Sequence, residues 1–92
     1  MAIRSFAHRG LEELFRTGRS KRIGAPYVKR VVTVLDYLDG ATGPGDLQGV
    51  LGFHALIGAR AGQYAMRISG NWRLTFRFDK SDVIEVDFED YH

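Results

Sequence analysis

The stretch WRLTFRF, residues 72–78, decides the fold class of this 92-residue chain. Apolar and polar residues alternate along it, with Trp72, Leu74, Phe76 and Phe78 set against Arg73, Thr75 and Arg77. Strict alternation is typical of a strand that has one buried face and one polar face. The stretch therefore predicts an antiparallel sheet with a core on one side and an arginine-bearing surface on the other.

The strand predicted before this stretch covers residues 63–68, and its pairing follows from parity. A three-residue connection over residues 69–71 sets Ile68 opposite Trp72 and Arg67 opposite Arg73. A slip of one residue would carry apolar side chains to the polar face. Gly70 in this connection tolerates the positive φ that such turns need.

The strand predicted after it covers residues 83–89, and parity favours a three-residue turn over residues 80–82. This turn keeps the apolar residues of both strands on one face. It predicts three pairs on the polar face, namely Arg77 with Glu85, Thr75 with Asp87, and Arg73 near Glu89.

The rest of the chain adds two helices and two strands. Strands are predicted over residues 2–8, where Gly10 breaks the strand, and over 53–57. One helix runs from Leu11 to a stop at Gly18, and the other runs from Pro26 to Gly40. The order β-α-α-β-β-β-β predicts one small α+β domain over residues 1–92. In it, a mainly antiparallel twisted sheet packs against two N-terminal helices.

The amino-acid composition excludes several kinds of chemistry for this protein. The chain has no cysteine, which excludes disulfides and thiolate chemistry. It has no apolar run of about 18 residues and no signal-peptide pattern, so we expect a cytoplasmic protein with no membrane partner.

Charge is distributed unevenly along the chain, although the net charge is only +2. Residues 1–30 carry eight basic and two acidic side chains, a net +6, whereas residues 31–92 carry five basic and nine acidic ones, a net −4. A basic segment favours a polyanionic partner such as nucleic acid. The alternative is an ordinary solvated surface.

The arginines of the polar face fall into two groups with different expected roles. Arg77 with Glu85 is typical of a cross-strand ion pair on a solvated sheet. Arg67 and Arg73 lie together near a turn and repel each other unless an anion bridges them. A phosphate would suit that place, and a solvated face is again the alternative.

His54 has two interpretations at this point. Phe53, Ala55 and Ile57 alternate to the other face of its strand, and a lone histidine on a strand is more often a structural residue than a functional one. A zinc site built from His54, Asp90 and His92 is the second interpretation, which the lack of cysteine and of any fixed ligand spacing disfavours.

Three stretches of the chain resemble one family. SFAHRGLEELFRTG, residues 5–18, is similar to the family's opening strand and helix. GFHALIGARAGQYAMRISGNWRLTF, residues 52–76, is similar to its central hairpin, and EDYH, residues 89–92, to its terminus. The combination of Asn-Trp-Arg-x-Thr-Phe with a terminal Asp-Tyr-His is the specific part. The chain resembles a RelE-superfamily toxin of the HigB type, the plasmid maintenance killer proteins.

The resemblance implies an endoribonuclease that cuts messenger RNA in the ribosomal A site without a metal or other cofactor. It also implies a HigA-like helix-turn-helix antitoxin as partner. Five catalytic residues carry over by position: His54, Arg73, Asp90, Tyr91 and His92. Arg60 carries over as an RNA contact. Arg67 is added to it because Arg67 lies opposite Arg73 on the predicted sheet. Ribosomal RNA would be gripped by Arg19, Lys21, Arg22, Lys29 and Arg30. The alternative is a non-catalytic RNA- or protein-binding module of the same fold.

These residue types suit RNA cleavage by the 2′-hydroxyl. The reaction needs a base for that hydroxyl and an acid for the departing 5′-oxygen, and histidine can serve as either. Arg73 would stabilise the charge that develops on the phosphorane, and Tyr91 could stack on a base or hydrogen-bond to it. The terminal carboxylate and Asp90 favour a protonated His92, so we expect His92 as the acid and His54 as the base.

The chain departs from the family at two positions. Ala55 and Ile57 stand where the family usually has proline and lysine. The loss of that lysine would leave Arg60, Arg67 and Arg73 to supply positive charge at the scissile phosphate, or leave the enzyme slower.

Overall fold

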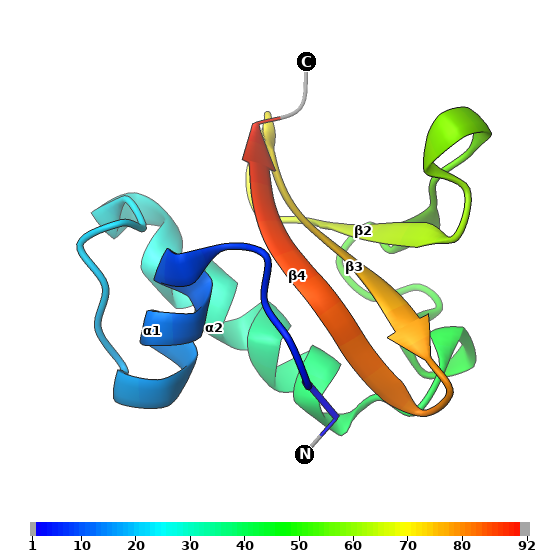
Figure 1. Ribbon diagram of the computed structural model, residues 1–92. Coiled ribbons are helices and arrows are strands. Elements are labelled where there is room, and N and C mark those ends of the chain that lie inside the picture. The colour runs from blue at the N-terminus through cyan, green and yellow to red at the C-terminus, as the bar shows by residue number, and fades with distance from the viewer. Residues whose placement is uncertain (1, 91–92) are drawn as a thin grey trace.

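The computed structural model describes residues 2–90 and has the expected α+β architecture. Two helices, α1 (Arg9–Thr17) and α2 (Ala25–Gly40), precede a four-stranded antiparallel sheet of order β1-β2-β3-β4. The strands are β1 (His54–Ala55), β2 (Gln63–Arg67), β3 (Trp72–Asp79) and β4 (Asp82–Asp90), and the short 3-10 helices are η1 (Pro44–Leu47) and η2 (Gly58–Arg60). Both helices lie on one side of the sheet (Figure 1). Within residues 2–90, no helix has the length and apolar character needed to cross a membrane.

The first predicted strand is shorter than expected. Only Ile3 and Phe6 pair with β4, opposite Val83 and Val86, and they do so in parallel. This extended segment runs beside β4 as a partial fifth strand and leads into α1 (Figure 1).

The strand expected over residues 53–57 is reduced to His54 and Ala55. Phe53 stacks on Tyr64 with ring centroids 5.3 Å apart, so it belongs to the core side as predicted. Ile57 does not, because the chain leaves the sheet and turns into η2, and the Ile57 side chain is 87% exposed.

Both helices have the predicted stops, but α1 begins earlier than predicted. His8 caps α1, since its Nδ1 accepts the Leu11 N–H at 3.2 Å. Gly10 therefore lies inside the first turn of α1 rather than ending a strand. The Gly18 N–H donates to the Leu14 carbonyl at 2.8 Å with Gly18 at φ 80°, a left-handed conformation that favours glycine. Pro26 lies in the first turn of α2, as expected.

The core fills the space between the helices and the apolar face of the sheet. Leu74 and Phe76 of β3 are fully buried against this layer, and Trp72 stacks on Phe88 at 4.5 Å. The helices contribute apolar residues that are also buried, namely Leu11, Leu14, Val31, Val34, Leu35 and Leu38. The prediction that the apolar residues of WRLTFRF face the core is confirmed.

The register of the β2–β3 hairpin is as predicted. Arg67 lies opposite Arg73, and the Ile68 N–H donates to the Trp72 carbonyl at 2.9 Å. The two arginines are therefore cross-strand neighbours on one face of the sheet.

The β3–β4 hairpin differs from the prediction near its turn. Asp79 pairs with Asp82, so the turn has two residues, and Ile84 lies opposite Arg77 on the polar side instead of with the apolar residues. The predicted ion pair is nevertheless present, with Arg77 Nε 3.4 Å from Glu85 Oε1. A bulge at Glu85, at φ 55°, then adds one residue to β4 and restores the expected parity. The Glu85 N–H donates to the Ser5 hydroxyl at 2.9 Å. Beyond the bulge, the predicted pairs Thr75–Asp87 and Arg73–Glu89 are both present.

Candidate active site

The face of the sheet that lies away from the helices carries the polar residues. Residues directly opposite each other in antiparallel strands share a face. One row of such partners runs His54, Ala65, Thr75 and Asp87 across all four strands, and the next row runs Arg67, Arg73 and Glu89. The fold thus brings His54, Arg67 and Arg73 onto one surface, which we call the polar face.

His54 lies at the edge of the polar face with its side chain exposed. Its Nδ1 is 2.9 Å from the carbonyl oxygen of Gly52. A carbonyl oxygen can only accept, so Nδ1 carries the proton in the neutral ring and Nε2 keeps a free lone pair. The local backbone therefore leaves the Nε2 atom of His54 able to accept a proton.

A pocket of about 310 Å³ adjoins His54. It is formed where the chain leaves β1 and enters η2, and it is lined by His54, Ala55, Leu56, Ile57 and Arg60. Two candidate site residues, a histidine and an arginine, thus border one pocket. The exposed Ile57 supplies apolar surface beside them.

Arg60 reaches from η2 to the end of β4. Its Nη1 and Nη2 donate to the two carboxylate oxygens of Glu89 at 2.9 and 2.6 Å, and its Nε donates to Gln63 Oε1 at 2.7 Å. The buried hydroxyl of Thr75 also donates to Glu89 Oε2. The hydrogen bonds from Arg60 and then from Thr75 lower the pKa of Glu89 below its ordinary value.

Arg67 and Arg73 lie one row away from His54. Arg67 is exposed, whereas Arg73 is half-buried. Arg30 of α2 joins them from the other layer, because its Nε donates to the Arg67 carbonyl at 3.3 Å. Lys29 and Arg30 also line a hollow of about 300 Å³ with Pro26 and Thr33. This end of the sheet therefore gathers basic residues from β2, β3 and α2.

The structure places Asp90 apart from this group. Asp90 pairs with Trp72, so the pleat puts it on the face of Trp72 and Phe88, opposite to that of His54 and Glu89. The zinc alternative would need His54 and Asp90 to share a face. Tyr91 and His92, the remaining predicted catalytic residues, lie outside the described residues.

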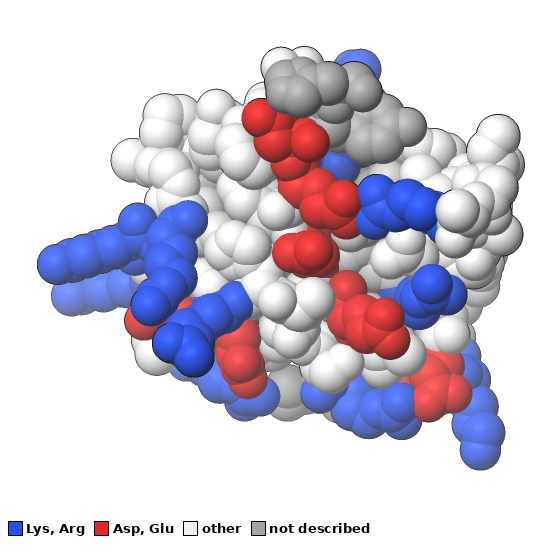
Figure 2. All heavy atoms as spheres, turned by 45° about the horizontal axis from the view of Figure 1, so that its top comes forward, with Lys and Arg blue, Asp and Glu red and all other residues white. Residues whose placement is uncertain are grey.

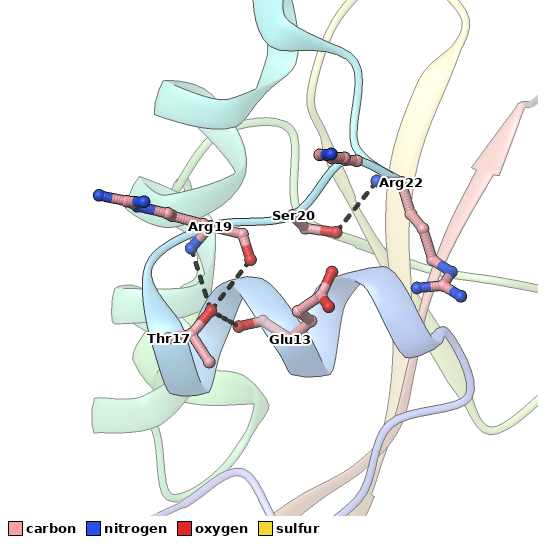
Figure 3. A pocket seen from close by; sticks show the side chains of 6 residues that line it. Glu13, Thr17, Arg19, Ser20 and Arg22 are labelled. Atoms are coloured by element: carbon pink, nitrogen blue, oxygen red, sulfur yellow. Dashed lines mark hydrogen bonds between the residues drawn. The ribbon is translucent and has the colours of Figure 1, made fainter.

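Arg19, Lys21 and Arg22 form a separate basic surface at the end of α1. With Glu13, Thr17 and Ser20 they line a hollow of about 460 Å³, shown in Figure 3. Hydrogen bonds between residues two apart in the sequence hold the loop. The Thr17 hydroxyl accepts the Arg19 N–H at 3.2 Å, and the Ser20 hydroxyl accepts the Arg22 N–H at 3.1 Å. None of the lining residues borders the His54 pocket.

Acidic side chains separate the two basic regions. Figure 2 shows Lys and Arg at the left, on the side of α1, and again at the right, with Asp and Glu over the middle of the face. Strand β4 supplies Asp87 and Glu89 to the polar face.

Sequence reasoning missed how Glu89 is used. The pairing of Arg73 with Glu89 put a carboxylate on the polar face, but nothing in the spacing linked it to Arg60, which is 29 residues away. Gln63, which also holds Arg60, carried no signal. These contacts depend on how η2 folds back over the sheet, which local periodicity does not report.

Comparison with known proteins places this chain in a family. Residues 4–92 match the HigB-like toxins, described as RelE-like toxins of the type II toxin–antitoxin system HigB. The chain is 37% identical over 91 residues to "Endoribonuclease HigB" from Proteus vulgaris. That alignment covers 98% of this chain and 99% of the relative.

Two solved structures share the fold. The YoeB–YefM complex and the YoeB dimer, both from Staphylococcus aureus, superpose with TM-scores of 0.61 and 0.60 at 20% identity. Each alignment covers 100% of this chain and 99% of the other. The resemblance predicted from the sequence is confirmed, and the chain belongs to the HigB-like family of RelE-like toxins of type II toxin–antitoxin systems.

Proposed function

We propose that this chain is an endoribonuclease toxin that cuts messenger RNA in the ribosomal A site by metal-independent attack of the RNA 2′-hydroxyl. The single observation that carries the proposal is the polar face, where His54 stands beside a pocket and next to the arginines of β2 and β3. The full-length relative from Proteus vulgaris is named an endoribonuclease, which supports the same activity here.

His54 is the base in this proposal. Its Nδ1 faces the Gly52 carbonyl, so the neutral ring offers Nε2 as the proton acceptor. A general base must stand within hydrogen-bonding reach of the proton that it removes, and an exposed His54 bordering a pocket is open to an RNA strand.

Arg73 stabilises the phosphorane in this proposal. It is half-buried and cross-strand to Arg67, which places two guanidinium groups on the face that carries His54. Preorganised donors aimed at developing charge act strongly because they need no reorganisation during the reaction. Arg60, at the pocket, is the further contact to the RNA backbone.

The remaining roles follow from the family resemblance. His92 is the general acid, Tyr91 stacks on or hydrogen-bonds to a splayed base, and Asp90 acts with His92. Because the pleat puts Asp90 on the face of Trp72, its influence on the reaction would be electrostatic, through the residues that follow it.

The basic residues outside the polar face hold ribosomal RNA in this proposal. Arg19, Lys21 and Arg22 stand on their own surface. Lys29 and Arg30 line a hollow on α2, beside the end of the sheet that carries Arg67. A toxin of a type II system has an antitoxin as its partner. We propose a HigA-like helix-turn-helix protein in that role, and a cytoplasmic location alongside the ribosome.

The proposal is tested with purified toxin, ribosomes and a message whose A-site codon is fixed. We expect a cut within the A-site codon, with H54A and R73A each slowing single-turnover cleavage about a hundredfold. R77A is the matched control, since Arg77 lies on the same strand but pairs with Glu85 at 3.4 Å, and it should change the rate less than about twofold.

Expression in cells separates the proposal from the alternative of a non-catalytic binding module. Growth arrest with cut transcripts, relieved by the product of the neighbouring gene, supports the nuclease. Arrest with intact transcripts would favour a module that binds without cutting. If both H54A and R73A cleaved RNA at the wild-type rate, the polar face would have no role in catalysis and the proposed mechanism would be wrong.

A further inference from the structure

We infer that Glu89 is a positioning residue of this active site, acting on the reaction by holding the Arg60 guanidinium at the pocket beside His54. The inference rests on the proposed function, because it gives Arg60 a role at the RNA. It gives a role to Glu89, which is absent from the site residues named so far.

Arg60 needs such support because its own segment is weakly held. It ends η2, a single 3-10 turn closed by hydrogen bonds of 3.4 Å from the Arg60 N–H and 3.1 Å from the Ala61 N–H. The turn begins at Gly58, with φ 68°, and is followed by Gly62, with φ 98°. A long arginine side chain on such a turn has many rotamers, so its place is set by side-chain contacts.

Glu89 supplies the strongest of these contacts. Both of its oxygens accept from Arg60 in a bidentate pair, a geometry that fixes direction as well as distance. Thr75, directly across the ladder from Asp87 and buried, holds the same carboxylate in place through its hydroxyl. The lowered pKa of Glu89 means that the pair stays charged at neutral pH.

The chain offers a contrast on the same strand. Glu85 also pairs with an arginine, but through one contact of 3.4 Å to Arg77, and its side chain is exposed. Exposed single contacts of this kind contribute little. Replacing either glutamate by glutamine changes the net charge by +1, so Glu85 is a matched control for Glu89.

The expected kinetic signature is a split between kcat and KM. A carboxylate near an RNA site repels phosphate, so E89Q should leave KM unchanged or lower it. Loss of the bidentate pair lets Arg60 move, and misplacement of a catalytic contact by about 1 Å can slow a reaction about a hundredfold. We therefore expect E89Q to lower kcat about ten- to a hundredfold, and E85Q to leave it within about twofold.

A double-mutant cycle asks whether Glu89 acts through Arg60. If it does, R60M and E89Q/R60M should have the same kcat, because the second change has nothing left to position. A kcat for E89Q within about twofold of the wild type would overturn the inference. So would a full additional loss when E89Q is combined with R60M.

A second measurement does not depend on cleavage. In ¹H–¹⁵N spectra, the Arg60 Nε–H should exchange slowly with solvent, since it donates to Gln63 at 2.7 Å while Glu89 holds the guanidinium. We expect faster exchange in E89Q and no change in E85Q, at similar melting temperatures. A signal unaltered in E89Q would overturn the inference. A signal that depends on Glu89 in a toxin that cuts no RNA would instead overturn the proposed function.

Discussion

Replacing Gly10 by alanine should destabilise the protein, although alanine usually favours helices over glycine. Gly10 lies buried in the first turn of α1, and an added Cβ would stand 2.6 Å from the Cβ of Arg22 and 2.8 Å from Cε1 of His8. Non-bonded carbon atoms rest about 3.5–4.0 Å apart, so the neighbours would have to move by about 1 Å. Neither moves easily, since Arg22 Cβ is attached to the loop backbone and the His8 ring caps the helix.

The size of the effect follows from three terms. Disturbing the His8 cap costs about 1 kcal/mol, as for other N-cap losses. Crowding in a packed site costs about 1–3 kcal/mol. The higher helix propensity of alanine offsets about 1 kcal/mol. The net loss is about 1–3 kcal/mol of unfolding free energy, and each kcal/mol shifts the melting temperature of a chain this long by roughly 4–8 °C.

Gly40 provides the matched control for this prediction. It is the last residue of α2, and a Cβ built there meets nothing within 4 Å. G40A should therefore leave the stability unchanged or raise it by up to about 1 kcal/mol. Urea and thermal unfolding followed by circular dichroism measure both variants. If G10A proved as stable as the wild type, the close approach of the basic loop to α1 would be wrong.

Three further predictions address the core, the pH response and the departure from the family. F76A should cost about 3–5 kcal/mol in urea unfolding, because Phe76 is fully buried between other rings, and a melting curve like that of the wild type would contradict its place in the core. The lowered pKa of Glu89 gives stability that is present above its ordinary pKa of 4.5 and is lost as the pH falls through the lower folded value. Unfolding free energies measured from pH 7 down to acid should thus fall less steeply below pH 4.5 for E89Q than for the wild type. I57K should raise the cleavage rate several-fold without a change in melting temperature. Ile57 is 87% exposed beside His54, so a lysine there would add positive charge at the pocket without being buried. An unchanged cleavage rate would show that residue 57 does not lie near the scissile phosphate.

Much of the fold was predictable because it depends on near neighbours in the sequence. Alternation along WRLTFRF set which side chains face the core, and the need to keep Ile68 with Trp72 set the first hairpin. Gly18 and Pro26 marked helix ends through their own backbone preferences. The second hairpin shows the limit of parity, since the two-residue turn puts Val83 rather than Ile84 on the core side, and the bulge at Glu85 restores the predicted faces only beyond it.

Some features of the candidate site also follow from the local sequence, whereas others depend on tertiary packing. The sequence by itself determined that Arg67 and Arg73 would share a polar face, and its motifs identified the family and, through it, His54 as a candidate site residue. Only the tertiary structure decided that Arg60 meets Glu89 and that Arg30 reaches the end of β2. Periodicity assigns a residue to a face of its own element. Which distant elements meet there depends on how the whole chain packs, and a salt bridge across 29 residues has no period to reveal it.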